Sequence, residues 1–380
     1  MPILITADDL ARRLDDERAG RAATRTVVLD VRWTLAVPDG RPAFRAGHIP
    51  GAVYVDLDHE LADHAAIGEG RHPLPSEAEF TRAMRRWGLR QGDTVVVMDD
   101  AGDQSAARAW WLLRHAGLED VRMLDGALAA WVGAGHPLET GRHAPEPGDA
   151  TAHFGAMPVI GADGAAEFPQ RGVLLDARAA ERYRGEVEPI DPRAGHIPGA
   201  RSAPSAGNLD AEQRFLAPDA MRERFAALGI EPGTPAAAYC GSGVTAAHEV
   251  AALAIAGIDA ALYPGSWSQW SNEADRPVAR RAPTARWSSR GPPRADPYRG
   301  RCAGSRYASR FARRYSITGS GRRPTAMSVV ASIVGTSRSA SAARKRLRTP
   351  SSAASSRSET IARNPVPLTS CHASSGVTST

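Results

Sequence analysis

The 380-residue sequence predicts an α/β fold that is built twice, as two tandem domains followed by a low-complexity tail. Three observations predict this organisation: motifs recur at an interval of nearly 150 residues, short apolar runs alternate with helical patterns, and the composition changes near residue 280. Because strands that alternate with helices form parallel sheets, each domain is expected to hold a mainly parallel sheet with helices on both faces.

The internal repeat is carried by closely matching motifs. Residues 45–52 (RAGHIPGA) recur as residues 193–200, and residues 29–32 (LDVR) recur as residues 175–178 (LDAR). The two offsets, 148 and 146 residues, differ slightly, so small insertions separate two copies of one unit.

Apolar runs and amphipathic patterns then predict the elements of each copy in order. Runs rich in valine, leucine, isoleucine or alanine are typical of buried strands, and the predicted strands are residues 26–29, 95–98, 173–175 and 234–239. Apolar residues at helical spacing predict helices at residues 80–87, 220–225 and 246–254. The expected boundaries are a first domain at 1–140, a linker rich in proline and glycine at 141–157, a second domain at 158–279 and a tail at 280–380.

Charge separates the two domains from the tail. Residues 1–280 hold 40 acidic side chains and 28 arginines, whereas residues 281–380 hold 2 acidic and 19 basic side chains. The tail also contains 20 serines and little apolar periodicity, so we expect it to be disordered. Its positive charge is the only feature of the chain that favours a nucleic-acid partner.

Composition also indicates where the protein is expected to occur and whether it is expected to need a metal or cofactor. No run reaches about 18 apolar residues, and acids at Asp8 and Asp9 precede any apolar core of signal-peptide length. The three cysteines, Cys240, Cys302 and Cys371, show neither a disulfide pattern nor metal-ligand spacing. We therefore expect a cytoplasmic protein that does not span a membrane and requires no metal or cofactor.

Cys240 is the candidate nucleophile. It opens the sequence Cys-Gly-Ser-Gly-Val-Thr (240–245) between a predicted strand and a predicted helix, and no other cysteine occurs in the first 301 residues. Backbone N–H groups and the positive end of a helix dipole meet at such a turn, which favours thiolate over thiol. A buried structural cysteine is the alternative for this local pattern. Asp100 occupies the matching position of the first copy, so the chain would hold one nucleophile.

Together these motifs resemble the two-domain rhodanese superfamily of sulfurtransferases over about residues 3–279. The resemblance rests on the repeated Gly-His-Ile-Pro-Gly-Ala, the Cys240 loop, and Gly-Ser-Trp-Ser-Gln-Trp at 265–270. It implies two rhodanese-like domains and a persulfide on Cys240, which would pass sulfur from a small donor to a thiol or cyanide acceptor. The first domain would then form a wall of the site.

The loop after Cys240 looks like that of 3-mercaptopyruvate sulfurtransferases, since enzymes that prefer thiosulfate usually carry basic residues there. This likeness implies a serine–histidine–aspartate set drawn from both domains, matched here by Ser242, His72 and Asp58. The loop residues expected to surround the donor are Gly241, Gly243, Val244 and Thr245.

The family also holds the carboxylate of its substrate with two arginines. Arg182 matches the first, and Arg193 is the candidate for the second, in a segment whose length differs from the family pattern. Residues 59–71 add length between Asp58 and His72, so a different local loop is expected there.

Several alternatives remain open at this stage. Thiosulfate could be the donor, and a non-catalytic sulfur-relay or binding module is a third possibility. A cysteine phosphatase is excluded, because it needs an arginine six positions after the nucleophile, where this chain has Ala246. Only one copy has the cysteine, so residues kept in both copies are predicted to be structural; they are His48, His196 and the pairs Asp30–Arg32 and Asp176–Arg178.

Overall fold

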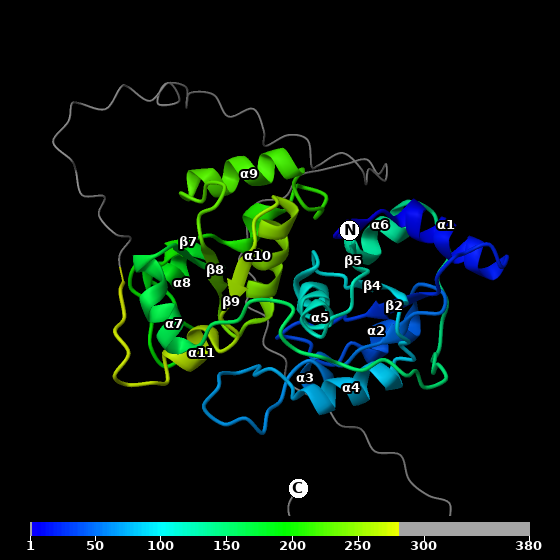
Figure 1. Ribbon diagram of the computed structural model, residues 1–380, viewed down its shortest axis with the longest axis horizontal. Helices are drawn as coiled ribbons and strands as arrows, with labels where there is room; N and C mark the ends of the chain where they lie inside the picture. Colours follow the sequence, from blue (N-terminus) through cyan, green and yellow to red (C-terminus); the bar gives the residue numbers. More distant parts are fainter. Residues whose placement is uncertain (1, 281–380) are drawn as a thin grey trace, which may run out of the picture. The chain divides into compact units, whose positions relative to one another are not determined.

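A computed structural model describes residues 2–280 of the chain (Figure 1). Apart from Arg280, the tail predicted at 280–380 lies outside the described residues. Residues 2–280 form two α/β domains, each built on a parallel sheet. No helix in this part of the chain has the length and apolar character needed to cross a membrane.

The first domain contains a five-stranded sheet in the order β1-β5-β4-β2-β3, in which every neighbouring pair is parallel. Its elements are β1 (Leu4–Ile5), α1 (Ala7–Arg18), β2 (Thr26–Asp30), α2 (Arg41–Ala46), β3 (Val53–Tyr54), α3 (Leu57–Glu60), α4 (Glu77–Arg86), β4 (Thr94–Met98), α5 (Gln104–His115), β5 (Val121–Leu124) and α6 (Ala127–Gly133). Helices α4 and α5 cover one face of the sheet, and α1, α2 and α6 cover the other.

The second domain repeats this plan with a four-stranded parallel sheet in the order β7-β6-β8-β9. Its elements are α7 (Ala162–Glu167), the short 3-10 helix η1 (Phe168–Gln170), β6 (Val173–Asp176), α8 (Ala180–Arg184), β7 (Arg201–Ser202), the 3-10 helix η2 (Ser205–Asn208), α9 (Pro218–Ala227), β8 (Ala236–Tyr239), α10 (Val244–Ile255), β9 (Ala260–Leu262) and α11 (Ser266–Trp270). Helices α9 and α10 cover one face of this sheet, and α7 and α11 pack on the other.

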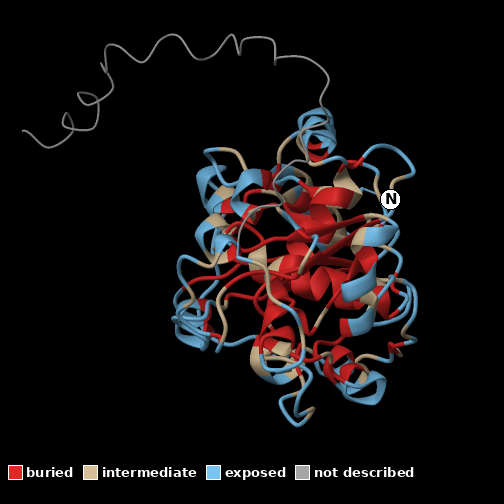
Figure 2. Ribbon diagram, turned by 90° about the vertical axis from the view of Figure 1, so that its left-hand side faces the viewer, coloured by how far each residue is buried: buried red, intermediate tan, exposed pale blue. Residues whose placement is uncertain are grey.

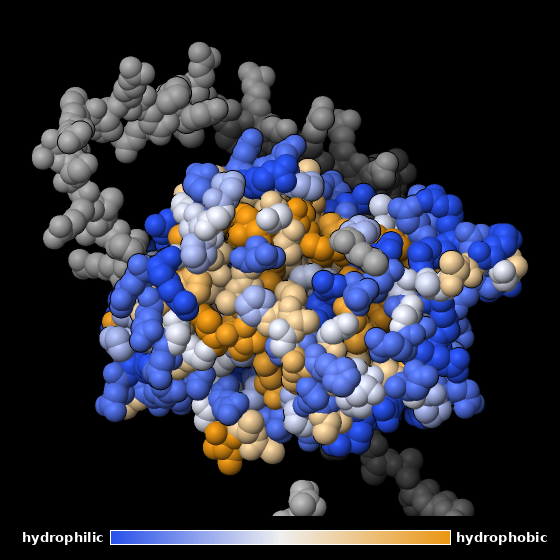
Figure 3. All heavy atoms as spheres, viewed as in Figure 1, coloured by the Kyte–Doolittle hydropathy of each residue, from blue (hydrophilic) through white to orange (hydrophobic). Residues whose placement is uncertain are grey.

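The predicted strands and helices are confirmed, and the local physics explains them. Strands β2 and β4 are buried at every position, as central strands of a parallel sheet covered on both faces must be. Helix α4 begins with a capping box, in which Ser76 and Glu79 satisfy each other's backbone N–H groups. Figure 2 shows the buried residues concentrated in the interior, with exposed residues on the surrounding loops and outer helices. On the face drawn in Figure 3, hydrophobic residues gather near the middle and hydrophilic residues surround them.

The residues shared by the two copies are structural, as predicted. Arg32 is paired with Asp30 at 2.7 Å and Arg178 with Asp176 at 2.6 Å, and all four side chains are buried. His48 contacts the Phe44 carbonyl at 2.8 Å through Nδ1, and His196 contacts the Tyr183 carbonyl at 2.7 Å in the same way. These contacts hold each Gly-His-Ile-Pro-Gly turn against the preceding helix.

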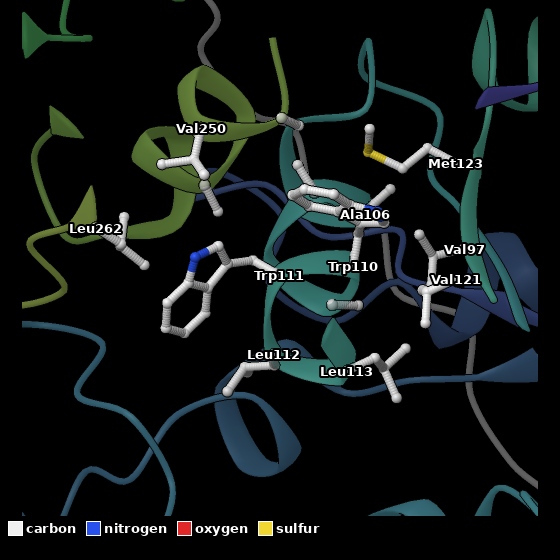
Figure 4. Close-up of a cluster of buried hydrophobic side chains, with 14 of the residues drawn as sticks. Val97, Ala106, Trp110, Trp111, Leu112, Leu113, Val121, Met123, Val250 and Leu262 are labelled. Carbon is white, nitrogen blue, oxygen red and sulfur yellow. The ribbon is translucent and has the colours of Figure 1, made fainter. Parts of the chain in front are cut away.

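The two domains share one hydrophobic core, because α5 of the first packs against α10 of the second. Nearly every residue of α5 is buried, including Trp110 and Trp111. Figure 4 shows Trp111 projecting from α5 toward Leu262 and Val250 of the second domain, whereas Trp110 lies nearer Met123 and Val97 of the first. A helix that is buried on nearly all sides needs partners on all of them, so the domain contact completes the fold of each half.

Replacing Trp111 with alanine should destabilise both domains together. The indole is fully buried in the shared core, so Trp111→Ala is expected to lower the free energy of unfolding by about 3–5 kcal/mol. Urea denaturation followed by circular dichroism measures this change. Val132→Ala, at a half-exposed position of α6, is the control and should change the unfolding free energy by less than about 0.5 kcal/mol. Loss of structure in only one domain would contradict the shared core.

Candidate active site

Cys240 lies at the turn between β8 and α10, as predicted, and its side chain is buried. The backbone N–H of Gly243 donates to Sγ at 3.2 Å, and the backbone N–H of Cys240 itself donates to the Ser266 hydroxyl at 3.1 Å. The sulfur therefore faces the N-terminus of a 12-residue helix, whose free N–H groups and dipole favour a negative charge.

Gly243 is required by this turn. Its φ is +82°, in the left-handed region that glycine adopts without strain, and a Cβ there would lie 2.4 Å from the Pro264 carbonyl oxygen. Because Gly243 caps α10 and supplies the N–H that reaches Sγ, any larger residue would displace the donor from the sulfur.

The structure brings Ser242, His72 and Asp58 together across the domain contact. His72 Nδ1 lies 2.8 Å from the Ser242 hydroxyl, and His72 Nε2 lies 3.3 Å from Asp58 Oδ1. The second oxygen of Asp58 accepts a hydrogen bond of 3.1 Å from the indole of Trp33, whose ring also meets the His72 ring edge to face at 5.2 Å. The histidine is thus held between a hydroxyl of one domain and a carboxylate of its own.

His72 is neutral in this environment. Burial lowers the pKa of His72 to about 4, and the charge of Arg108 acts in the same direction, while Asp58 opposes it. The Asp58 carboxylate, 3.3 Å from Nε2, favours the tautomer with its proton on Nε2, and in that tautomer Nδ1 can accept the proton of the Ser242 hydroxyl. This arrangement has the geometry of a proton relay that ends at Ser242.

Two guanidinium groups lie against the cysteine loop. A Cβ placed on Gly241 would be 3.4 Å from Arg71 Nη2 and 3.5 Å from Arg182 Nη1. Arg71 comes from the first domain and pairs with Asp191 at 2.9 Å, and Arg182 pairs with the other oxygen of Asp191 at 3.2 Å. Arg182 also contacts Glu188 at 2.6 Å. Two arginines side by side are suited to a small carboxylate, which can accept from both.

Arg193 corrects the sequence prediction. Its guanidinium donates to five backbone carbonyl groups, those of Trp270, Ser271, Glu273, Ala274 and Arg276, at 2.6–3.3 Å. With its donors used in holding the segment after α11, Arg193 does not line the cavity beside Cys240. The arginine that lies beside Arg182 against Gly241 is instead Arg71 of the first domain, whereas the sequence prediction places it in the segment that follows Arg182.

A cavity of about 400 Å³ opens between the domains beside these groups. The second domain contributes Cys240, Gly241, Ser242, Val244 and Thr245 to its wall together with Arg178 and Arg182, and the first domain contributes Trp33, Leu35 and Arg71. Gly243 acts through its backbone N–H. Within residues 2–280, no group of three or more potential ligands is arranged to hold a metal ion.

The residues between Asp58 and His72, where a different local loop was predicted, form the connection from α3 to α4. The loop between α3 and α4 extends toward α11 of the second domain in Figure 1, and the backbone N–H of Arg71 donates to the Ser268 hydroxyl at 2.9 Å. This bond anchors the loop to the opposite domain. Arg71 then lies in the cavity wall, and His72 contacts Ser242. The one sequence signal for Arg71 was its position next to His72.

Comparison with known proteins gives consistent results. The rhodanese-like domain model matches residues 6–134 and again residues 162–273. A Mycobacterium tuberculosis protein named putative thiosulfate sulfurtransferase SseB is 47% identical over 284 residues, covering 73% of this chain and 97% of its own length. A Pseudomonas aeruginosa protein named probable 3-mercaptopyruvate sulfurtransferase is 46% identical over 283 residues, with the same coverage.

The structure of SseA, a 3-mercaptopyruvate sulfurtransferase from Escherichia coli, superposes with a TM-score of 0.61 at 33% identity, covering 70% of this chain and all of that one. The two matched segments contain β2 to α6 of the first domain and α7 to α11 of the second, so each covers nearly all of one sheet and its helices. The chain therefore belongs to the rhodanese family and carries two rhodanese-like domains.

Proposed function

We propose that the protein is a sulfurtransferase that moves sulfur from 3-mercaptopyruvate to a thiol or cyanide acceptor through a persulfide on Cys240. The observation that carries this proposal is the 2.8 Å contact between His72 and Ser242, because it joins a proton relay of the first domain to the cysteine loop of the second. A cytoplasmic location is part of the proposal, since a reactive thiolate persists in a reducing compartment.

The chemistry follows from this geometry. The Cys240 thiolate attacks the donor sulfur, the carbon–sulfur bond breaks, and its electron pair remains on carbon as the enolate of pyruvate. The proton of the donor thiol passes through Ser242 to His72 Nδ1 and returns to the enolate carbon, so the step neither consumes nor releases a proton. The products are pyruvate and an ionised persulfide, whose charge the Gly243 N–H group stabilises. An acceptor thiolate then removes the terminal sulfur.

The charge around the cavity favours a singly charged carboxylate as donor. Three arginines (Arg71, Arg178 and Arg182) face three carboxylates (Asp176, Glu188 and Asp191), and each arginine is already paired. Since the cluster is balanced, it offers hydrogen-bond donors without a large excess of positive charge. A thiosulfate dianion would need more compensation than this cluster supplies, and the residues after Cys240 are uncharged.

Thiosulfate remains the second candidate donor. The relative from Mycobacterium tuberculosis bears that name, and two adjacent guanidinium groups also suit a small sulfur oxyanion. The predictions below therefore compare the two donors directly.

Cys240→Ser should abolish sulfur transfer from either donor. Treatment of the wild-type protein with donor is expected to add about 32 Da, one sulfur atom, to the peptide that contains Cys240, and the variant should show no adduct. Intact and peptide mass spectrometry measure both. Cys302→Ser and Cys371→Ser are the controls and should keep the adduct. A Cys240→Ser protein that still transfers sulfur would leave only the binding or relay role.

Arg71→Gln and Arg182→Gln should each raise the KM for 3-mercaptopyruvate about tenfold, because each removes one guanidinium from the carboxylate position. Steady-state kinetics with both donors measures the effect. Arg184→Gln is the matched control, since Arg184 lies on the same helix as Arg182 but is exposed and, among residues 2–280, pairs with Glu186 alone. An unchanged KM for 3-mercaptopyruvate in Arg71→Gln would show that Arg71 does not bind the carboxylate of the donor.

The proton relay through Ser242 and His72 should be visible in the pH dependence of a rate ratio, namely the rate with 3-mercaptopyruvate divided by the rate with thiosulfate. Transfer from thiosulfate releases sulfite and needs no proton on carbon, so dividing the 3-mercaptopyruvate rate by the thiosulfate rate cancels the titration of the cysteine. Because protonated His72 cannot accept a proton, this ratio is expected to hold above about pH 5 and to fall as the pH approaches 4. Stopped-flow or steady-state rates from pH 4 to 8 measure the ratio.

Ser242→Ala provides the comparison for this profile. Removing the hydroxyl interrupts the relay, so the 3-mercaptopyruvate to thiosulfate rate ratio is expected to fall about a hundredfold at every pH. The ratio should also no longer decrease as the pH approaches 4. Equal slowing of both donors in Ser242→Ala would remove the serine from the relay.

A further inference from the structure

Asp191 is a buried carboxylate that two arginines of the site share, one from each domain. Its Oδ1 lies 2.9 Å from Arg71 Nη1, and its Oδ2 lies 3.2 Å from Arg182 Nη2. The Asp191 side chain is only 2% exposed, and it does not line the cavity beside Cys240, whereas both arginines do. A donor in the cavity would therefore meet the two guanidinium groups, and the aspartate would lie behind them.

The pairing with Asp191 decides which nitrogens of the two arginines remain free. Arg71 uses Nη1 for Asp191, and Arg182 uses Nε and Nη2 for Glu188 and Asp191. Among the described residues, Arg71 Nη2 and Arg182 Nη1 have no hydrogen-bond acceptor. These two nitrogens lie 3.4 and 3.5 Å from the position of a Cβ built on Gly241. Each domain thus turns one free guanidinium nitrogen toward the cysteine loop.

Asp191 also stands in a row of alternating charges that crosses the domain contact. Glu188 pairs with Arg178 at 3.2 Å and with Arg182 at 2.6 Å, and its Oε1 accepts from the backbone N–H of Asp191 at 3.2 Å. The row runs Arg178–Glu188–Arg182–Asp191–Arg71. Within residues 2–280, its last pair is the ion pair that joins the two domains, so Asp191 fixes Arg71 relative to Arg182.

The charge of Asp191 sets the net charge that a donor meets. With asparagine at position 191, the three arginines at the cavity would face two carboxylates, Asp176 and Glu188, and one positive charge would be in excess. A singly charged carboxylate can accept from the two free nitrogens in either case. A dianion gains more from an excess positive charge, because the Coulomb attraction scales with the charge of the ligand.

We propose that Asp191 determines the donor specificity of the site. It holds one guanidinium of each domain with a free nitrogen toward Gly241, and it cancels the charge that would favour a dianionic donor. Asp191 is a positioning residue, because it acts through Arg71 and Arg182. The ligand class that fits is an anion of single charge whose carboxylate accepts from both domains. This inference rests on the proposed function in placing the donor beside Gly241.

Asp191→Asn tests the role of the charge, because asparagine keeps the size of the side chain. The quantity to measure is kcat/KM for thiosulfate divided by kcat/KM for 3-mercaptopyruvate, in the full-length protein. This ratio is expected to rise about tenfold over wild type, chiefly through a lower KM for thiosulfate. The rise should shrink at high ionic strength, since salt screens the excess charge. Equal slowing of both donors, with an unchanged ratio, is the result of a merely structural role and would overturn the proposal.

Two control variants separate this effect from others. Glu186→Gln removes the same charge from the same segment, but Glu186 is exposed and pairs with Arg184, so the ratio should stay within about twofold of wild type. A tenfold rise there would assign the effect to the overall charge of the protein and overturn the proposal. Asp191→Glu keeps the charge, so it should keep the wild-type ratio even where the longer side chain slows both donors. A tenfold rise in this variant would overturn the role of the charge.

A paired substitution decides the question if Asp191→Asn does not fold. Arg71→Gln alone leaves one carboxylate in excess, so the ratio of thiosulfate to 3-mercaptopyruvate use should fall about tenfold. Adding Asp191→Asn removes both members of the buried pair and leaves neither charge unpaired. The ratio is then expected to return to within about twofold of wild type. A double variant that keeps the ratio of Arg71→Gln would overturn the proposal.

Failure of this inference is distinguishable from failure of the proposed function. The Cys240→Ser test decides the nucleophile, and a wild-type protein that strongly prefers thiosulfate would contradict the proposed donor. The Asp191 experiment compares a variant with wild type, so the expected direction of change is the same whichever donor the wild type prefers. If 3-mercaptopyruvate is not used at all, the KM for thiosulfate is compared by itself, and a value that does not fall in Asp191→Asn overturns the inference.

Discussion

The packing of α5 against α10 is the contact on which the rest of this structure depends. Helix α5 is buried on nearly every side, and it belongs to one apolar cluster together with α4, α9 and α10. Neither domain can cover this surface alone, so the two halves are held in a fixed relation by the strongest non-directional force available to them. The chemistry uses that relation, since His72 and Arg71 lie in one domain and Cys240 in the other.

The two copies of the unit differ at the position that holds the nucleophile in the second. In the first copy the residue that directly follows the strand, as Cys240 follows β8, is Asp99 and not the predicted Asp100. The carboxylate of Asp99 accepts from the backbone N–H groups of Ala101, Asp103, Ser105 and Ala106, at 2.8–3.1 Å. These N–H groups stand at the start of α5 and are the counterparts of those that face the sulfur at the start of α10. A built-in carboxylate thus fills the anion position of the first copy. That loop is left with a structural task, while its helix supplies Trp111 and Arg108 to the contact.

Most of the fold and the centre of the site could be predicted from the sequence, for reasons that are local. The repeated motifs and the strand–helix alternation depend on neighbours in the chain, and the Cys240 turn is encoded by Gly241 and Gly243 beside the sulfur. The roles of Arg71 and Arg193 could not be predicted in this way. Which carbonyl or carboxylate an arginine meets depends on packing between elements far apart in sequence: Arg193 meets carbonyls about 80 residues away, and Arg71 meets Asp191, 120 residues away.

The arginines of the site therefore fall into two groups, those that pair with carboxylates and Arg108, which bonds to backbone carbonyls. The two groups have different roles. Those that face the cavity are neutralised by carboxylates, so they can present hydrogen bonds to a donor and exchange partners without a large change in charge. Arg108 is buried, does not line the cavity, and donates to the Leu61 and His72 carbonyls, so it holds the two ends of the loop between Asp58 and His72. Binding of the donor and placement of His72 would then depend on different arginines, the first on Arg71 and Arg182 at the cavity and the second on Arg108 at the domain contact.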